Sequence, residues 1–353
     1  MMMTAMMNIS TSNKVAIFSD LHMGVHCHSP LWHKTSINYA KWLAKSLKSK
    51  GITDIIFCGD FFHDRDSVAV STIHAASNFL NELVDFNIMM FPGNHDCFYK
   101  QHAEINSLSI LEGRKNLTVF HKMQRISIGE NCTATLCPWG TTVEEIDPCD
   151  VTFGHFEIQT FKMNTFKMCE HGMSIRQILE RSPLIFSGHF HWRDERLFEI
   201  GKIIYVGNPF QMDMNDSNNV KGYYIFDGDE KSFEFVENDS SPLLYRFKLS
   251  YICNEEMDLD ELYGMIRGNV IQFIIDEHLS SDDLAMLKNK ISSFQPLQID
   301  FSEEYSDVQR DQDQSAFDGI DAGQAIVEFI ELMNYPNKAE LQKYAIDLYR
   351  KYK

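Results

Sequence analysis

The chain has 353 residues, of which 44% are hydrophobic, and this is enough for one large domain and a smaller one. No apolar run is long enough to span a bilayer and the Met-rich start lacks the basic region and long apolar core of a signal peptide, so we expect a cytoplasmic protein with no membrane partner. Eight scattered cysteines favour reduced thiols, and the net charge of −18 argues against a generic nucleic-acid binder.

Residues 1–13 are expected to be a disordered start. From residue 14 to about residue 210, apolar runs typical of strands alternate with stretches of helical spacing, as at 39–47 and 73–83. This alternation favours a largely parallel sheet covered by helices. Further strand-like runs between residues 117 and 249 suggest an antiparallel patch or a second sheet. The predicted fold class is therefore α/β (α+β), with a two-sheet sandwich flanked by helices over residues 14–250.

The remaining residues read as smaller units. Residues 251–301 alternate helix and strand and predict a small β/α module. Residues 302–319 are acidic and Gln-rich, which is typical of a flexible linker. Residues 320–353 predict two helices with apolar stripes, which pack either on their own domain or on a partner. Residues 251–353 hold 21 acidic and 9 basic residues, so the acidity of the chain says more about this part than about the substrate.

Polar side chains follow five of the strand-like runs, at the point where each run ends. Ligands of an α/β sheet gather beyond the carboxyl ends of its strands, so we expect these side chains to meet at one rim. Asp, Asn and His are the ligand types of a two-metal hydrolase. The residues are Asp20 and His22, Asp60 and His63, Asn94 to Asp96, His155, and His189 and His191.

Seven of these residues are predicted metal ligands for two divalent cations. In an extended Asp-x-His segment, Asp20 and His22 would point to the same side and hold the first cation. Asp60 is assigned to both cations because a carboxylate has two oxygens. Asn94, His155 and His189 are assigned to the second cation and His191 to the first. Mixed nitrogen and oxygen ligands favour Mn²⁺ or Fe²⁺, while Zn²⁺ and Mg²⁺ are further candidates.

Two histidines are predicted to be catalytic. The cations would activate a bridging water as hydroxide for in-line attack on a phosphodiester. His95 is not needed as a ligand if Asn94 is one, so we expect it to donate to the phosphate or protonate the leaving oxygen. His63 is expected to support this near the scissile phosphate, and Asp96 to be the partner of a histidine.

Other residues have plainer interpretations. We expect His26, His28 and His33 to line a substrate path rather than bind metal, and His171 to be a loop residue. Trp139 could stack on a base, but core packing is the preferred interpretation.

At the five segments the chain resembles the calcineurin-like metallophosphoesterases, and within them the SbcD branch, or meiotic recombination 11 family, of DNA repair nucleases. The matching motifs are Ser-Asp-Leu-His-Met-Gly (19–24), Gly-Asp-Phe-Phe-His-Asp-Arg (59–65), Pro-Gly-Asn-His-Asp (92–96), Gly-His-Phe-Glu (154–157) and Ser-Gly-His-Phe-His (187–191). The likeness covers about residues 14–236. The compact size is similar to that of the tailed-phage members, which would place the protein in a host cytoplasm. Several bacterial and phage members carry Asp where this chain has His63.

The resemblance implies a manganese-dependent DNA exonuclease and endonuclease of a recombination and double-strand-break repair complex. It also implies a homodimeric nuclease core, a large SMC-like ATPase partner of the SbcC type, a DNA-contacting module at 251–301 and docking of residues 320–353 on the ATPase. The alternative is a stand-alone phosphatase or cyclic-nucleotide phosphodiesterase with the same site chemistry. Such an enzyme has no need of the C-terminal module and helices, so the interpretation as a nuclease is preferred.

Overall fold

The computed structural model describes residues 9–99, 102–163, 167–254 and 258–304, together with Ile330, Lys338 and residues 341–345. The linker expected at 302–319 and the helices expected at 320–353 therefore lie almost entirely outside the described residues. No helix in the described ranges has the length and the apolar character needed to cross a membrane.

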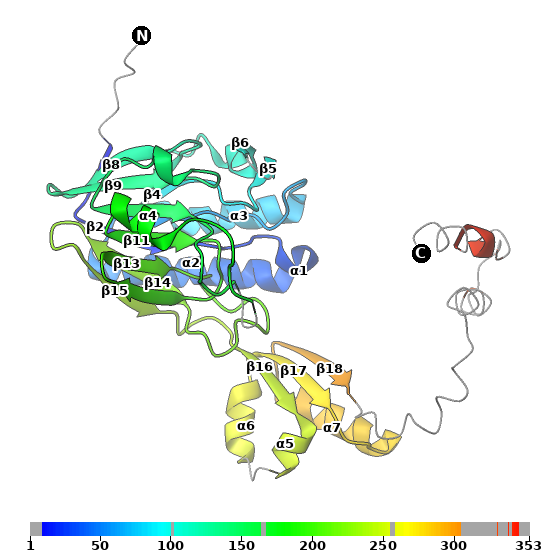
Figure 1. Cartoon of the computed structure of the whole chain (residues 1–353). Coiled ribbons are helices and arrows are strands. Elements are labelled where there is room, and N and C mark those ends of the chain that lie inside the picture. Colours follow the sequence, from blue (N-terminus) through cyan, green and yellow to red (C-terminus); the bar gives the residue numbers. More distant parts are fainter. Residues whose placement is uncertain are drawn as a thin grey trace.

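Two sheets that face each other form the larger part of the molecule (Figure 1). The six-stranded sheet has the order β15-β14-β2-β3-β4-β7, and its strands are β2 (Lys14–Phe18), β3 (Asp54–Phe57), β4 (Asn87–Met90), β7 (Leu117–Val119), β14 (Gly222–Asp227) and β15 (Ser232–Glu237). The seven-stranded sheet has the order β1-β8-β9-β10-β11-β13-β12, and its strands are β1 (Ile9–Thr11), β8 (Gln124–Ile128), β9 (Cys132–Cys137), β10 (Val151–His155), β11 (Leu184–Gly188), β12 (Asp194–Phe198) and β13 (Gly201–Tyr205). The predicted two-sheet α/β sandwich is confirmed.

The first strand lies in the segment that we expected to be disordered. β1 pairs in parallel with β8, with Ile9 opposite Ile126 and Thr11 opposite Ile128. Ile9 also packs against the apolar cluster between the sheets, and this burial of apolar surface stabilises the short strand. A three-residue strand with a single apolar side chain carries too little pattern to be recognised from sequence.

Strands β2, β3 and β4 of the six-stranded sheet are apolar on both faces, because each face is covered. Along β2, Val15 and Ile17 pack in the cluster between the two sheets, whereas Ala16 and Phe18 pack in the cluster beneath the helices. Successive side chains of a strand point to opposite faces, so a strand buried on both sides reads as a continuous apolar run. This is why the runs were visible in the sequence.

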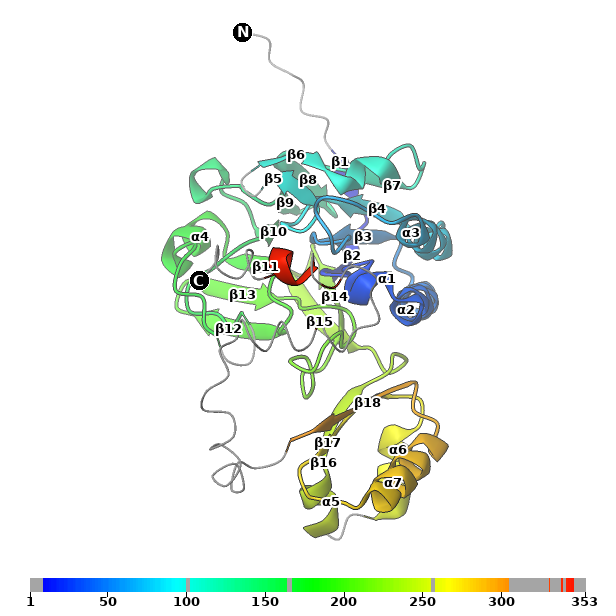
Figure 2. The same cartoon turned by 90° about the vertical axis from the view of Figure 1, so that its right-hand side faces the viewer.

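Helices cover the outer faces of the sandwich (Figure 2). Helices α2 (Pro30–Lys50) and α3 (Val70–Glu82) lie on the six-stranded sheet, and α4 (Ile175–Arg181) lies on the seven-stranded sheet. Helix α2 begins with Pro30 in its first turn and ends at Gly51, whose left-handed φ of 68° suits a residue without a Cβ. A short turn, α1 (Val25–His28), precedes α2, and the hairpin β5 (Cys97–Tyr99) and β6 (His102–Asn106) follows the Asn94 segment.

A separate three-stranded parallel sheet carries its own apolar cluster. Its strands are β16 (Leu244–Lys248), β17 (Val270–Ile275) and β18 (Gln298–Glu303), and its helices are α5 (Leu249–Asn254), α6 (Leu259–Ile266) and α7 (Ser281–Ser293). We had grouped the Leu244–Leu249 strand with the large domain, but β16 pairs with β17 instead. On this pairing we propose that the small module begins at β16, after the turn at Asn238–Pro242.

Candidate metal centre

The predicted ligands come from the carboxyl ends of strands in both sheets. Strands β2, β3 and β4 of the six-stranded sheet lead to Asp20 and His22, Asp60 and Asn94, while β10 and β11 of the seven-stranded sheet lead to His155, His189 and His191. The rim is therefore shared between two sheets that meet at this end. Asp20, Asp60, His155 and His22 are at most 2% exposed. Polar and charged side chains that are buried this close together cost free energy unless hydrogen bonds or opposite charges compensate for the lost water.

Four of these residues have a left-handed backbone. The φ angles are 54° at Asp20, 45° at His22, 59° at Asp60 and 90° at His189. Such conformations cost about 1–3 kcal/mol each in residues with a Cβ, and they cluster at functional sites. The explanation expected from the sequence is wrong on this point. Asp20 and His22 face one side because the loop after β2 coils, whereas we had assumed an extended segment with alternating side chains.

The first cluster contains Asp20, His22 and His191, with Asp60 at its edge. The Nε2 atoms of His22 and His191 are 2.9 Å apart, and His22 Nε2 is 3.6 Å from Asp60 Oδ2. Burial, and the neighbouring His191, hold the pKa of His22 well below its usual range, so the ring is neutral. Imidazole nitrogens and carboxylates that lie this close together form a donor set suited to a divalent cation.

The second cluster contains Asp60, His155 and His189, and Asn94 lies among them. Asn94 Oδ1 is 2.9 Å from His155 Nε2 and 2.7 Å from His189 Nδ1. His155 Nδ1 lies 2.8 Å from the carbonyl oxygen of Cys58, which can only accept, so this nitrogen carries a hydrogen. In the neutral ring, Nε2 then presents a lone pair to the Asn94 oxygen.

Two facing lone pairs repel unless a cation or a proton lies between them. With its amide reversed, Asn94 would donate to both histidines and accept from Arg65 Nη2 at 3.0 Å, which satisfies these groups without a cation when both rings are neutral. The donor atoms therefore fit a bound cation, toward which Asn94 would turn its oxygen.

Asp60 is the residue common to both clusters. Its Oδ2 atom is 3.6 Å from His22 Nε2 and 3.4 Å from His155 Nε2, and its Oδ1 atom accepts from the backbone N–H of His95 at 2.7 Å. Burial would raise the pKa of Asp60, but the charge and hydrogen bond of His155 hold it far below its usual range. Burial lowers the pKa of His155, but Asp60 and Asp20 outweigh this and raise it to about 9. The centre thus attracts positive charge.

Asp96 supports the centre through the backbone. Its carboxylate accepts from the N–H groups of Asp60, Phe61, Phe62 and Gly93 at 2.8–3.2 Å. We expected Asp96 to be the partner of a histidine, and that expectation is wrong. The carboxylate instead holds the loop that presents Asp60.

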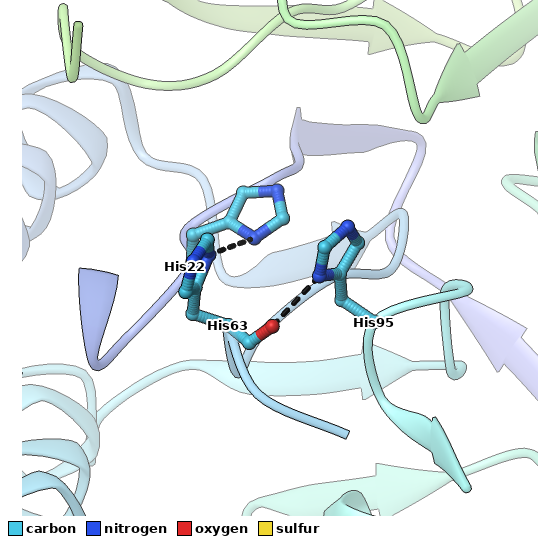
Figure 3. Close-up of side chains that lie close together, drawn as sticks. All are labelled: His22, His63 and His95. Atoms are coloured by element: carbon cyan, nitrogen blue, oxygen red, sulfur yellow. Dashed lines mark hydrogen bonds between the residues drawn. The ribbon is translucent and has the colours of Figure 1, made fainter. Parts of the chain in front are cut away.

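His63 and His95 lie together beside the first cluster (Figure 3). His95 Nδ1 donates to the carbonyl oxygen of His63 at 2.7 Å, so Nε2 is the nitrogen of His95 that remains for a substrate. His63 Nδ1 is 3.4 Å from His22 Nδ1. If His22 binds a cation through Nε2, its Nδ1 carries the hydrogen and donates to His63, which would orient the His22 ring.

Three residues near the centre were missed or undervalued in the sequence. Arg65 reaches the Asn94 amide, and Glu157 Oε1 lies 3.3 Å from His189 Nε2, an arrangement that would fix His189 to face the cluster through Nδ1. Trp139 contacts the His189 ring, with centroids 5.1 Å apart. Arg65 and Glu157 stand inside the quoted motifs, so their position was the available signal.

The histidines set aside in the sequence lie outside the clusters found among the described residues. His26 Nε2 is 2.8 Å from the carbonyl oxygen of Met212, and His28 and His33 both contact the Thr72 hydroxyl. Each of the three rings therefore has a hydrogen-bond partner outside the predicted ligand set.

Comparisons with known proteins agree with this geometry. A family model described as "Calcineurin-like phosphoesterase" matches residues 13–254. The chain is 26% identical over 279 residues to "Exonuclease subunit 1" of Enterobacteria phage T4, and the match covers 76% of this chain and 79% of that protein.

Solved structures resemble the chain more distantly. A dimetal phosphatase from Danio rerio shares 9% identity, with 60% of this chain and 91% of that chain covered and a TM-score of 0.37. The GAP50 anchor of the inner membrane complex of Plasmodium shares 11% identity, with 76% and 98% covered and a TM-score of 0.39. Likenesses at this level carry no argument about function.

Proposed function

Because the chain belongs to the calcineurin-like phosphoesterase family, we propose that it is a two-metal DNA nuclease, the exonuclease and endonuclease subunit of a recombination and double-strand-break repair complex. The observation that carries the two-metal part is the position of Asp60, whose carboxylate lies within 3.6 Å of histidine nitrogens from both clusters. The relative from phage T4, which is named as an exonuclease subunit, supports DNA as the substrate and supports a partner subunit.

Seven residues are proposed to hold the cations. Asp20, His22 and His191 would hold the first, Asn94, His155 and His189 the second, and Asp60 both. Three imidazole or amide donors with one shared carboxylate favour Mn²⁺, with Fe²⁺, Zn²⁺ and Mg²⁺ as alternatives for the metal analysis to decide. When bound, such ions supply Lewis acidity, which acidifies water and neutralises phosphate oxygens.

The other residues of the centre orient groups and move protons. His95, held through Nδ1 by the His63 carbonyl, is proposed to give a proton from Nε2 to the leaving oxygen of the sugar. His63 is proposed to hold His22 in one tautomer through their facing Nδ1 atoms. With Asn94 turned toward a cation, the Arg65 guanidinium loses its acceptor, so we propose that it binds a non-bridging oxygen of the phosphodiester.

We also propose the partners that the family resemblance implies. These are a second copy of the chain and an SMC-like ATPase of the SbcC type. The small module from β16 to β18 is proposed to contact DNA beside the centre.

A digestion assay tests the nuclease proposal. The metal-loaded chain is incubated with end-labelled duplex and single-stranded DNA in Mn²⁺ or Mg²⁺, beside a phosphomonoester and a cyclic nucleotide. We expect the DNA to be shortened in Mn²⁺ and the two small substrates to turn over poorly. Turnover of the small substrates without DNA cleavage would contradict the nuclease function and favour the stand-alone phosphatase or phosphodiesterase.

A further inference from the structure

A groove of about 530 Å³ opens beside the metal centre, and Trp139 forms part of its wall. The lining also includes His102 of β6, His121, Lys122 and Glu145. No predicted metal ligand lines this groove, so it is distinct from the centre itself.

Trp139 lies between the groove and the centre. Its backbone N–H donates to the carbonyl oxygen of Pro92 at 2.9 Å, which ties it to the turn that carries Asn94. Its ring centroid is 5.1 Å from that of His189 and 5.9 Å from that of His155, and the side chain is only half-buried. One part of the indole thus contacts predicted ligands of the second cation, while another part lines the groove.

The charges of the groove favour an uncharged occupant. Lys122 Nζ is 3.7 Å from a Glu104 carboxylate oxygen, and His121 Nε2 is 2.6 Å from Glu112 Oε1. Glu104 and Glu145 both line the groove and would repel a phosphate. A flat aromatic group with polar edges suits a wall of indole surrounded by hydrogen-bonding side chains, and a nucleobase is such a group.

We propose that Trp139 is the platform on which a nucleobase next to the scissile phosphate stacks, with the groove receiving that base. This inference rests on the proposed nuclease function and adds a substrate-binding residue to it. Stacking on an aromatic ring tolerates every base because each has a π-face, so the platform would hold the strand without selecting a sequence. The sequence reading of Trp139 as a core residue would then be replaced.

The test combines two variants with a modified substrate. Trp139→Ala removes the platform, whereas Trp139→Phe keeps an aromatic face. Trp42→Ala is the matched control, because Trp42 of α2 is another half-buried tryptophan and packs against Tyr39 and Tyr223. For each, kcat/KM is measured on an end-labelled oligonucleotide, on the same strand with an abasic residue at either side of the cleaved bond, and on bis(4-nitrophenyl) phosphate. Metal content is measured in parallel.

We expect Trp139→Ala to lose roughly 5- to 150-fold more kcat/KM on the intact oligonucleotide than on bis(4-nitrophenyl) phosphate, mainly through KM. The kcat/KM of the wild-type chain should fall by a similar factor when the base on one side of the cleaved bond is removed. The kcat/KM of Trp139→Ala should not fall further on that abasic strand. Trp139→Phe should keep most of the DNA activity, and Trp42→Ala should show the wild-type ratio between the substrates.

Three results would overturn the platform. Equal losses on both substrates with a lowered metal content would mean that Trp139 only positions His189. Additive losses from the variant and the abasic strand would mean that the base lies elsewhere. A wild-type chain that hydrolyses the small diester but leaves every oligonucleotide intact would overturn the nuclease function, and the platform with it.

Discussion

His155 shows at the scale of a residue how the centre prefers a cation. The Cys58 carbonyl occupies Nδ1, and Nε2 faces the oxygen of Asn94 and the carboxylate of Asp60. In the metal-free chain a proton takes the place of the cation, since Asp60 and Asp20 raise the pKa of His155 to about 9, against burial, which lowers it. A proton and the proposed cation would therefore compete for the same nitrogen.

This competition predicts a pH dependence of metal binding. Below about pH 9 the metal-free ring holds a proton that a cation must displace, so the affinity for Mn²⁺ should rise by up to about tenfold per pH unit and level off above the pKa. The raised pKa also stabilises the metal-free fold below the ordinary histidine pKa, and this contribution is lost as the pH rises through about 9. Calorimetric titrations of the metal-free chain at about pH 7 and about pH 8 measure the effect, and equal affinities would contradict it.

The position of His95 predicts a separation of chemistry from metal binding. His95→Asn should keep both metals, because Asn94 and not His95 faces the second cluster, yet it should slow DNA cleavage by about 10²–10⁴-fold through loss of the proton donor. His74→Asn on α3 is the control, since His74 contacts only Asn78 among its described hydrogen bonds. Metal analysis measures the number of bound ions, and single-turnover cleavage measures the rate of the chemical step. A His95 variant that lost a metal would show that His95 is a ligand.

Asp20 and His22 show what a motif can and cannot reveal. The residue types of the ligands and their positions at strand ends could be predicted from the sequence, and the structure brings all seven predicted ligands together. The coil after β2, with left-handed φ at both residues, was not readable, because a positive φ in Asp or His is held by surrounding contacts and leaves no pattern in the chain. Arg65 was missed for a related reason: its contact with Asn94 joins segments that follow different strands.

At the scale of an element, glycine lets two loops approach closely. A Cβ at Gly93 would collide with Oδ1 and the backbone nitrogen of Asp60 and with the His155 ring. We therefore expect Gly93→Ala to displace Asp60, to lower stability by about 1–3 kcal/mol and to weaken metal binding.

Gly264→Ala in α6 is the matched control for Gly93→Ala. A Cβ there meets nothing within 4 Å, so alanine should leave stability unchanged or raise it by about 0.5–1 kcal/mol. Denaturant melts and metal titrations of both variants make the comparison. A Gly93 variant as stable and as metal-rich as the Gly264 variant would refute the close packing around Asp60.

The strands also show where sequence reasoning ends. Runs such as Ile55–Phe57 were visible because both faces are buried and turn residues bound them. The sheet to which each strand belongs was not visible, since pairing depends on contacts between distant segments. The pairing of β16 with β17 was therefore not foreseen, and β1 was not recognised.

At the scale of the whole molecule, the two sheets depend on each other for function. The six-stranded sheet supplies Asp60 and Asn94, the seven-stranded sheet supplies His155 and His189, and the apolar cluster between them keeps the two rims in register. Neither sheet alone carries all the donors proposed for either cation, so metal binding would require the two sheets to be folded against each other.

The C-terminal segment supports a prediction from sequence alone, because residues 320–353 lie almost entirely outside the described part of the chain. Its apolar stripes need a covering surface. Deleting residues 320–353 should leave a chain that melts cooperatively and binds two metals but no longer co-purifies with the proposed SMC-like ATPase partner. Aggregation of the truncated chain would place the segment in the nuclease core, and retained co-purification would place the docking site elsewhere.

The most direct test of the two-metal centre is a count of metal ions per chain in the Asp60→Asn variant. The wild-type chain should bind two ions and the variant neither at the same free metal concentration, because the amide replaces the carboxylate that reaches both clusters. Asp64→Asn changes a half-exposed neighbour and should keep both ions. An Asp60→Asn chain that still bound two ions with wild-type affinity would contradict the shared-carboxylate centre.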